Sequence, residues 1–299
     1  MRGIIVENIA NLYQIQKLDE ESNILTYEAT ARGRFKKEEI SPVVGDFVIF
    51  EVTDEKNNKA VINKILERNV YVKRPKLANL TQIILVVSSK NPKPDLLLLD
   101  KQLAFAEFLG IKALIVLNKT DLDDKSEFKK LKEIYEKIGY TVIITEAKKG
   151  KGTEKLTEKL KNNINAFSGN SGVGKSTLIN RIFNKNITEE GEISQRNKRG
   201  KNTTTAIKLY LIDKNTYIAD TPGFSTFSIE EIESNKLANY FLEFKNEITN
   251  CEFVGCTHIK EENCGIKKAI QEGKIEKTRY ERFCKIYQQL KEREEKKKW

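Results

Sequence analysis

The sequence predicts a multi-domain protein in which an all-β barrel is followed by an α/β domain with a mostly parallel sheet and then by a helical domain. The first 70 residues contain short runs of alternating polar and apolar side chains between turn residues. From about residue 80, near-continuous apolar runs alternate with helical segments. After Phe224 the chain becomes helical and charged. We therefore place the domains at residues 1–70, 71–227 and 228–299.

The amino-terminal region contains five short segments that we expect to be strands. Turn signals such as Gly45-Asp46 and Lys56-Asn57-Asn58 separate them. Five strands in about 65 residues fit a small closed barrel, and an OB-type barrel is the leading candidate. Barrels of this type often bind nucleic acid, whereas a barrel that only supports the fold is the alternative. The expected strands are Gly3–Asn8, Leu12–Lys17, Ile24–Ala31, Asp46–Thr53 and Ala60–Ile65.

The central region alternates buried strands with helices, as in sheets that bind ligands at the carboxyl ends of their strands. Pro94-Asp95 opens a helix that runs to Leu109 and is ended by Gly110, and Ser126 caps a helix that ends at Gly139. The expected strands are Ile83–Val87, Ala113–Leu117, Tyr140–Thr145, Ile164–Phe167 and Thr216–Ala219, and the later helices are Thr153–Leu160 and Lys175–Phe183.

The composition is that of a soluble globular protein, with 32% charged and 39% hydrophobic residues. No apolar run approaches the roughly 20 residues that cross a bilayer, and Met1-Arg2-Gly3 leads into expected strands and not into a signal sequence. We therefore expect a cytoplasmic protein with no membrane partner. The net charge of +10 favours a polyanionic partner such as RNA, DNA or an anionic membrane face, against the alternative of solvated lysine-rich surfaces.

One eight-residue stretch fits the phosphate-loop pattern G-x-x-x-x-G-K-S. Glycines in such a loop let successive amide N–H groups turn inward around phosphates, and the following helix adds its positive end. Lys175 should reach the β- and γ-phosphates, and the Ser176 hydroxyl should bind Mg²⁺. The predicted phosphate-binding residues are Gly169, Asn170, Ser171, Gly172, Val173, Gly174, Lys175, Ser176 and Thr177.

A second motif, Asn118-Lys119-Thr120-Asp121, predicts that the base of the nucleotide is guanine. The Asp121 carboxylate can accept two hydrogen bonds from the guanine edge, the Lys119 stem can lie along the ring, and Asn118 can tie this loop to the phosphate loop. Alone, N-K-x-D also fits a surface turn. Ala147 and Lys148, after the next strand, fit a companion loop that touches the guanine carbonyl. The base-reading motif precedes the phosphate loop, the reverse of the usual GTPase order, as in a circular permutation.

Two further segments complete the predicted site for GTP hydrolysis. Asp220 follows the strand that ends at Ala219 and is the acid expected near the metal, while the amide of Gly223 could sense the γ-phosphate. Residues 194–205 lack apolar periodicity and contain three threonines, of which we assign Thr204 to Mg²⁺ when the γ-phosphate is present. This segment also suits contact with RNA phosphates, against the alternative of a solvated charge run; its basic residues are Arg196, Lys198, Arg199 and Lys201.

A cysteine and histidine cluster near the carboxyl end reads C-x4-C-x-H-x5-C. Three thiolates and one imidazole suit tetrahedral Zn²⁺, and four protein ligands leave no open position for catalysis. We therefore predict one structural zinc ion, against the alternative of unrelated buried cysteines. Cys284 is expected to be a packed thiol on a basic helix that runs from Ile275 to Trp299. The predicted zinc ligands are Cys251, Cys256, His258 and Cys264.

The order of these motifs resembles the ribosome small-subunit-dependent GTPase A family of bacterial circularly permuted GTPases. The segments Arg32-Gly33-Arg34-Phe35, Pro42-Val43-Val44-Gly45-Asp46 and Phe241 to Phe244 add to the resemblance. It implies an OB barrel, a GTPase and a zinc domain. It also implies binding of GTP or GDP and of the 30S ribosomal subunit with its 16S rRNA late in assembly, with hydrolysis stimulated there and linked to release. Separately, we expect the protein to be a monomer.

This chain departs from the family pattern at two positions. Many relatives carry histidine just before the three threonines, where this chain has Gly200-Lys201-Asn202. Phe224 stands where other GTPases place a glutamine that orients water. The resemblance therefore assigns no water-positioning residue here. Two alternatives stay open: an RNA-binding module that uses guanine nucleotide only as a ligand, and a permuted GTPase of large-subunit assembly.

Overall fold

The computed structural model describes residues 1–18, 23–33, 35, 40–123, 126–186, 207–220 and 229–296. The chain divides into two compact units, each assembled from segments that are distant in sequence. The first unit consists of Met1–Ile83, Thr153–Phe167 and Ser176–Phe224, and the second consists of Ile84–Gly152, Ser168–Lys175 and Ser225–Trp299. The domain boundaries predicted at residues 70 and 227 stay a prediction.

The first unit contains the closed five-stranded barrel that the alternating pattern predicts. The pairs β1–β2, β2–β3, β4–β5 and β1–β4 are antiparallel, and β3–β5 is parallel, so the pairing returns to the first strand. Inward side chains such as Ile5, Ile15, Phe50 and Ile62 are at most 1% exposed and fill the interior. The strands are β1 (Arg2–Ile9), β2 (Leu12–Leu18), β3 (Ile24–Ala31), β4 (Phe47–Asp54) and β5 (Lys59–Ile65).

Two strand pairs that the sequence did not predict extend the first unit. A short hairpin joins β6 (Tyr71–Lys73) to β7 (Lys76–Ala78). An antiparallel pair joins β12 (Lys208–Asp213) to β13 (Thr216–Asp220), and β12 also pairs with β1 at Lys208 and Glu7. The strand β11 (Ile164–Ser168) runs parallel to β13, so both strands end at the same edge. The helices of this unit are α4 (Thr153–Leu160) and α5, which begins at Lys175 and ends at Asn186.

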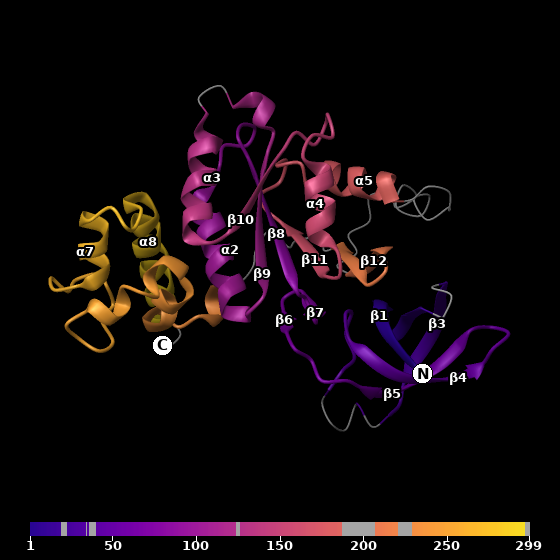
Figure 1. Ribbon diagram of the computed structural model, residues 1–299. Coiled ribbons are helices and arrows are strands. Elements are labelled where there is room, and N and C mark those ends of the chain that lie inside the picture. Colours follow the sequence, from indigo (N-terminus) through magenta and orange to yellow (C-terminus); the bar gives the residue numbers. More distant parts are fainter. Residues whose placement is uncertain are drawn as a thin grey trace. The chain divides into compact units, whose positions relative to one another are not determined.

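The sheet of the second unit has the strand order β10-β9-β8. Its strands are β8 (Gln82–Ser88), β9 (Lys112–Asn118) and β10 (Thr141–Thr145), and β9 and β10 are parallel. Every residue of β8 is buried, as its continuous apolar run predicts. The helices α2 (Leu96–Leu109) and α3 (Glu127–Ile138) lie side by side next to β9 and β10 (Figure 1).

The sequence predicts the capping residues of two helices in the second unit, and the structure confirms one of them and replaces the other. Asp95 caps α2, because its carboxylate accepts a hydrogen bond from the amide of Leu98 at 2.9 Å. Ser126 occupies the cap position of α3 but makes no capping hydrogen bond with its side chain. The Asp123 carboxylate performs that role, accepting from the amides of Glu127 and Phe128 at 3.1 and 3.0 Å. A longer carboxylate from the preceding turn thus replaces the predicted hydroxyl cap.

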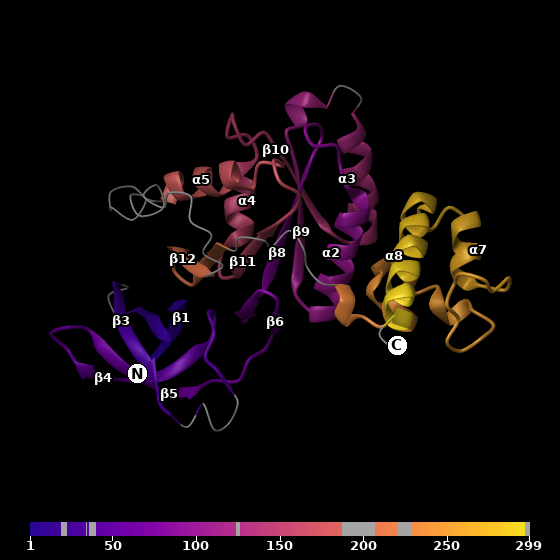
Figure 2. The same ribbon diagram turned by 180° about the vertical axis from the view of Figure 1, so that it is seen from behind.

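Residues 229–296, which we call the carboxy-terminal module, form an apolar core within the second unit, and Ala104 of α2 contributes to it. Phe241, Phe244 and Phe283 are fully buried, with ring centroids 4.9–5.3 Å apart. The helix α7 (Gly265–Gln271) lies beside α8 (Lys277–Lys296), the predicted basic helix (Figure 2). The module's 3-10 helices are η2 (Ile229–Glu231), η3 (Ser234–Tyr240), η4 (Leu242–Phe244) and η5 (Ile248–Asn250). Across the described part of the chain, no helix is both long enough and apolar enough to span a bilayer.

Candidate nucleotide site and metal centre

The predicted phosphate loop connects β11 to α5, at the carboxyl edge of the sheet. Gly169 and Gly174 have φ values of +135° and +104°, a region that residues with a Cβ rarely adopt. A Cβ at Gly169 would lie 2.3 Å from the carbonyl oxygen of Val86, and one at Gly174 would lie 2.3 Å from Nδ2 of Asn118. These positions therefore require glycine for space as well as for backbone conformation.

Lys175 points back into the phosphate loop. Its Nζ donates hydrogen bonds to the carbonyl oxygens of Gly169 at 2.6 Å and Asn170 at 2.8 Å. Burial lowers the pKa of this lysine below its usual value. The ammonium group is thus held inside the loop, where a pattern of this type places the phosphates.

Asn118 joins the three loops that the sequence assigns to guanine nucleotide binding. Its Oδ1 accepts hydrogen bonds from Thr145 Oγ1 at 3.0 Å and from the amide of Ala147 at 3.1 Å. Its Nδ2 donates to the carbonyl oxygen of Val173 at 2.9 Å. Because Asn118 is only 1% exposed, this arrangement is fixed by the protein itself. The sequence predicted Thr145 as the last residue of its strand, but it did not predict the hydrogen bond of this side chain to Asn118.

The remaining residues of the base-reading motif lie next to Asn118. Lys119 adopts a left-handed conformation with φ +61°, and its Nζ donates to the carbonyl oxygen of Asn91. Thr120 Oγ1 lies 3.4 Å from the carbonyl oxygen of Thr145, in the companion loop. Asp121 and Lys148 are exposed. The Asp121 carboxylate is therefore accessible to a base.

The predicted metal and catalytic residues are only partly within the described residues. Ser176 and Thr177 are exposed in the first turn of α5, and Asp220 is partly buried at the end of β13. Thr204 and Gly223 lie outside the described residues, as do Asn202, Phe224 and the basic segment 194–205. The metal-binding and catalytic roles of these residues stay predictions.

A substitution at Gly174 tests whether the contact with Asn118 controls the site. We expect Gly174→Ala to displace Asn118 and to weaken guanine nucleotide binding by about tenfold or more, because a buried amide that loses its partner costs about 1–3 kcal/mol. Gly172→Ala is the matched control: φ is also positive there, at +80°, but the nearest atom to a new Cβ is Pro92 Cδ at 3.6 Å. Calorimetric titration with GDP measures both variants, and equal losses would show that the clash with Asn118 is irrelevant.

The predicted zinc ligands converge in the carboxy-terminal module. The ligand atoms of Cys251, Cys256, His258 and Cys264 all lie within 4.8 Å of one another. His258 Nδ1 lies 3.5 Å from the Cys251 sulfur and 3.4 Å from the Cys264 sulfur. Bond lengths of about 2.3 Å to sulfur and 2.0–2.1 Å to nitrogen predict about 3.6 Å in a tetrahedral zinc site. The geometry and the donor set both fit zinc.

Two residues outside the predicted ligand set, Tyr280 and Glu261, hold the backbone around His258 in place. The hydroxyl of Tyr280 donates to the carbonyl oxygen of His258 at 2.7 Å. The Glu261 carboxylate accepts from the amides of Thr257 and Ile259 at 2.9 and 3.1 Å. Although burial raises the pKa of Glu261, these hydrogen bonds lower it to about 2. The sequence analysis missed both residues, since supporting contacts leave no spacing signal.

Comparison with known proteins places this chain in a family. A family model described as RsgA GTPase matches residues 63–230, and one described as RsgA N-terminal domain matches residues 2–62. The chain is 40% identical over 299 residues to a Clostridium botulinum (strain Langeland) protein, with both chains covered completely. The chain belongs to the RsgA GTPase family. Another relative, from Alkaliphilus metalliredigens, is 38% identical and covers 97% of this chain and 98% of its own length. Both relatives are named "Small ribosomal subunit biogenesis GTPase RsgA".

Solved structures of similar proteins share the whole architecture of this family member. The crystal structure of YjeQ from Thermotoga maritima matches with a TM-score of 0.83 and 36% identity, over 97% of this chain and 98% of that one. The structure of YloQ, described as a circularly permuted GTPase, matches with a TM-score of 0.81 and 27% identity, over 98% and 95%. The predicted barrel and permuted GTPase fold are thus confirmed, and the predicted family is correct.

Proposed function

We propose that this chain is a GTP hydrolase that binds the small (30S) ribosomal subunit and assists its late maturation. The observation that carries the proposal is the buried hydrogen-bonding of Asn118 to the companion loop and to the phosphate loop. This arrangement gives the guanine-reading motif and the phosphate loop one fixed geometry. The full-length relatives named for small-subunit biogenesis support the choice of partner.

The proposed reaction is attack of water on the γ-phosphate of GTP. On nucleotide binding, the Lys175 ammonium would exchange the carbonyl oxygens of Gly169 and Asn170 for phosphate oxygens and neutralise their developing charge. Magnesium bound with GTP would supply further charge neutralisation. The Ser176 hydroxyl is the proposed ligand of that ion, with Asp220 nearby and Thr204 and Gly223 completing the site when GTP is present.

The other proposed properties follow from charge and from the metal cluster. The net charge of +10 suits contact with 16S rRNA phosphates. The four-ligand cluster is proposed to hold one structural zinc ion that keeps the carboxy-terminal module folded. We further propose that the protein acts as a cytoplasmic monomer.

Purified ribosomal subunits test the proposed partner. We expect slow hydrolysis by the protein alone, because the side chains of Asn202 and Phe224 cannot act as a general base. We expect 30S subunits to raise the rate by about 10³–10⁵-fold if they supply the missing group, as activating partners of other GTPases do. The measurement is GTP turnover with 30S subunits, with 50S subunits as the control. Equal rates with and without 30S subunits would contradict the proposed stimulation.

A substitution at Asp121 tests the assignment of the base. Because the carboxylate is proposed to accept two hydrogen bonds from guanine, Asp121→Asn should lose about 1–3 kcal/mol of that discrimination. Competition binding should then show weaker binding of guanosine nucleotides and new binding of xanthosine nucleotides. Asp123→Asn is the control, because that carboxylate caps α3 and lies in the same loop. An Asp121 variant that still ignores xanthosine and adenosine nucleotides would show that the assignment is wrong.

A further inference from the structure

A cluster of four charged residues, of which Asp100 and Arg279 are buried and Glu243 and Arg282 half-buried, joins the carboxy-terminal module to α2. Asp100 of α2 is fully buried, and its two carboxylate oxygens accept hydrogen bonds from Arg279 and Arg282 of α8. Arg279, which is 1% exposed, also donates to the carboxylate of Glu243 next to it. The hydroxyl of Tyr135 in α3 donates to Asp100 at 2.7 Å. The two negative charges of the carboxylates are thus neutralised by the two positive charges of the guanidinium groups.

Such a cluster holds elements in one geometry. Buried ion pairs often contribute little net stability, because desolvation offsets their attraction, but they tolerate only arrangements in which every charge keeps its partner. The guanidinium carbon of Arg279 also lies 4.8 Å from the ring centroid of Phe241 and 5.4 Å from that of Tyr135. A rotation of the module on α2 would break the ion pairs of Arg279 and Arg282 with Asp100 and the contact of Arg279 with Tyr135.

The same helix also holds the phosphate loop. Asp95, which caps α2, accepts a hydrogen bond from Asn170 Nδ2 in the phosphate loop at 3.2 Å. Gln102, which is 2% exposed, donates to Ser168 Oγ at 2.7 Å, directly before that loop. Asp95, Asp100 and Gln102 lie within about two helical turns. The phosphate loop and the module belong to the same compact unit of the chain, and α2 contacts both.

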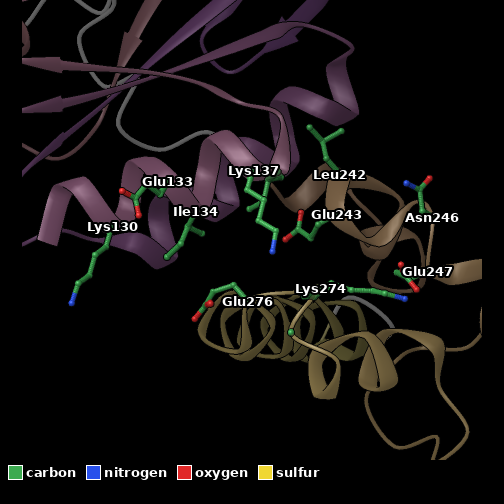
Figure 3. Close-up of a pocket in the computed structure, with 13 residues that line it drawn as sticks. Lys130, Glu133, Ile134, Lys137, Leu242, Glu243, Asn246, Glu247, Lys274 and Glu276 are labelled. Atoms are coloured by element: carbon green, nitrogen blue, oxygen red, sulfur yellow. The ribbon is translucent and has the colours of Figure 1, made fainter.

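The helix α3 is separated from part of the module by a groove of about 500 Å³. In Figure 3, Lys130, Ile134 and Lys137 extend from α3 on one side, while Lys274 and Glu276 belong to the segment before α8 on the other. The α3 helix therefore packs loosely here, and its hydrogen bond to the cluster comes from Tyr135. The attachment of the module therefore depends on α2.

We propose that Asp100, acting through Arg282 and Arg279, is a positioning residue that makes the carboxy-terminal module follow the phosphate loop when guanine nucleotide binds. The inference rests on the proposed function and adds a chain of contacts through which nucleotide binding changes the position of the module. A nucleotide that contacts Asn170 displaces Asp95 through the hydrogen bond between these two side chains. Because Asp95 caps α2, the helix shifts as one rigid body. Asp100 then transmits this shift to α8 through its ion pairs with Arg279 and Arg282.

Hydrogen exchange with and without a GTP analogue and Mg²⁺ tests this route in the full chain. In the wild-type protein we expect altered exchange in both the phosphate loop and α8. Arg282→Gln removes one partner of Asp100 at a side chain that is 14% exposed, so the fold should survive. This variant should keep the response of the phosphate loop and lose that of α8, whereas Arg282→Lys should restore it. The 30S-stimulated GTPase rate of Arg282→Gln should fall about tenfold at an unchanged intrinsic rate.

The matched control breaks a different contact of α8. Glu294 accepts hydrogen bonds from the amide and hydroxyl of Ser234 at 2.6 and 2.7 Å. Glu294→Gln should leave the α8 response intact. The proposal is overturned if α8 ignores the nucleotide while the phosphate loop responds, if Arg282→Gln keeps the α8 response, or if Glu294→Gln alone removes it. A phosphate loop that ignores guanine nucleotides would instead refute the proposed function, and the inference with it.

Discussion

Lys175→Ala is expected to reduce GTP hydrolysis by at least about 100-fold, the usual cost of removing one preorganised group that stabilises a transition state. The lysine ammonium already lies inside the phosphate loop, bound to the carbonyl oxygens of Gly169 and Asn170. No other lysine of the loop can replace it, because the stretch 169–176 contains only this one. The measurement is a single-turnover assay with saturating 30S subunits, which separates the chemical step from product release.

The control for this variant is Lys155→Ala, which removes an exposed lysine of α4 outside the predicted site. Its hydrolysis rate should equal that of the wild-type protein. Thermal unfolding of Lys175→Ala should stay close to wild type, so that the loss cannot be ascribed to unfolding. A Lys175→Ala protein that is folded, binds 30S subunits and retains more than half of the wild-type rate would show that the assigned charge stabilisation is wrong.

Removal of the zinc ion is expected to unfold the carboxy-terminal module. Apparent binding free energies of about 10–16 kcal/mol in small zinc modules are comparable to the whole stability of about 5–15 kcal/mol of most domains. Cys264 is 4% exposed and starts α7, and the His258 ring packs against Phe244 with centroids 6.2 Å apart. Cys264→Ala, or chelation of the wild-type protein, should therefore make residues 229–296 sensitive to protease and abolish one bound zinc per chain.

Cys284→Ala is the matched control for the zinc experiment. Cys284 is half-buried on α8 but does not belong to the group of ligand atoms. This variant should bind one zinc ion and resist protease as the wild-type protein does. The barrel should stay folded in both variants, because the strands β1 to β5 pair with one another into a closed barrel. A Cys264→Ala protein with wild-type zinc content would rule out the assigned ligand set.

Local signals allowed much of the fold to be predicted. The barrel strands were located to within one or two residues, because alternation and turn residues are properties of short segments. The strand β12 was missed because its half-exposed residues show little periodicity. The cap of α3 was assigned to Ser126 and not to Asp123, because both residue types favour this position and only the backbone conformation decides between them.

The candidate site likewise contains residues that the sequence predicted and contacts that it could not predict. Asn118, Lys175 and the four proposed zinc ligands were predicted from residue type and spacing. The structure brings the three cysteines and the histidine together, and the roles of all these residues stay predictions. The ion pair between Asp100 and Arg279 could not be predicted, because 179 positions separate the two residues and neither belongs to a motif. The side-chain hydrogen bonds of Thr145 and Gln102 were missed for the same reason, since they depend on which strands and helices become neighbours.

Calorimetric titration of the protein with GDP in the presence of Mg²⁺, with ADP as the comparison, tests the central claim most directly. The claim is that the loops joined by Asn118 form one guanine nucleotide site. We expect one molecule of GDP to bind per chain with measurable heat, and ADP to produce none under the same conditions. Equal heats for the two nucleotides, or no heat with GDP, would contradict it.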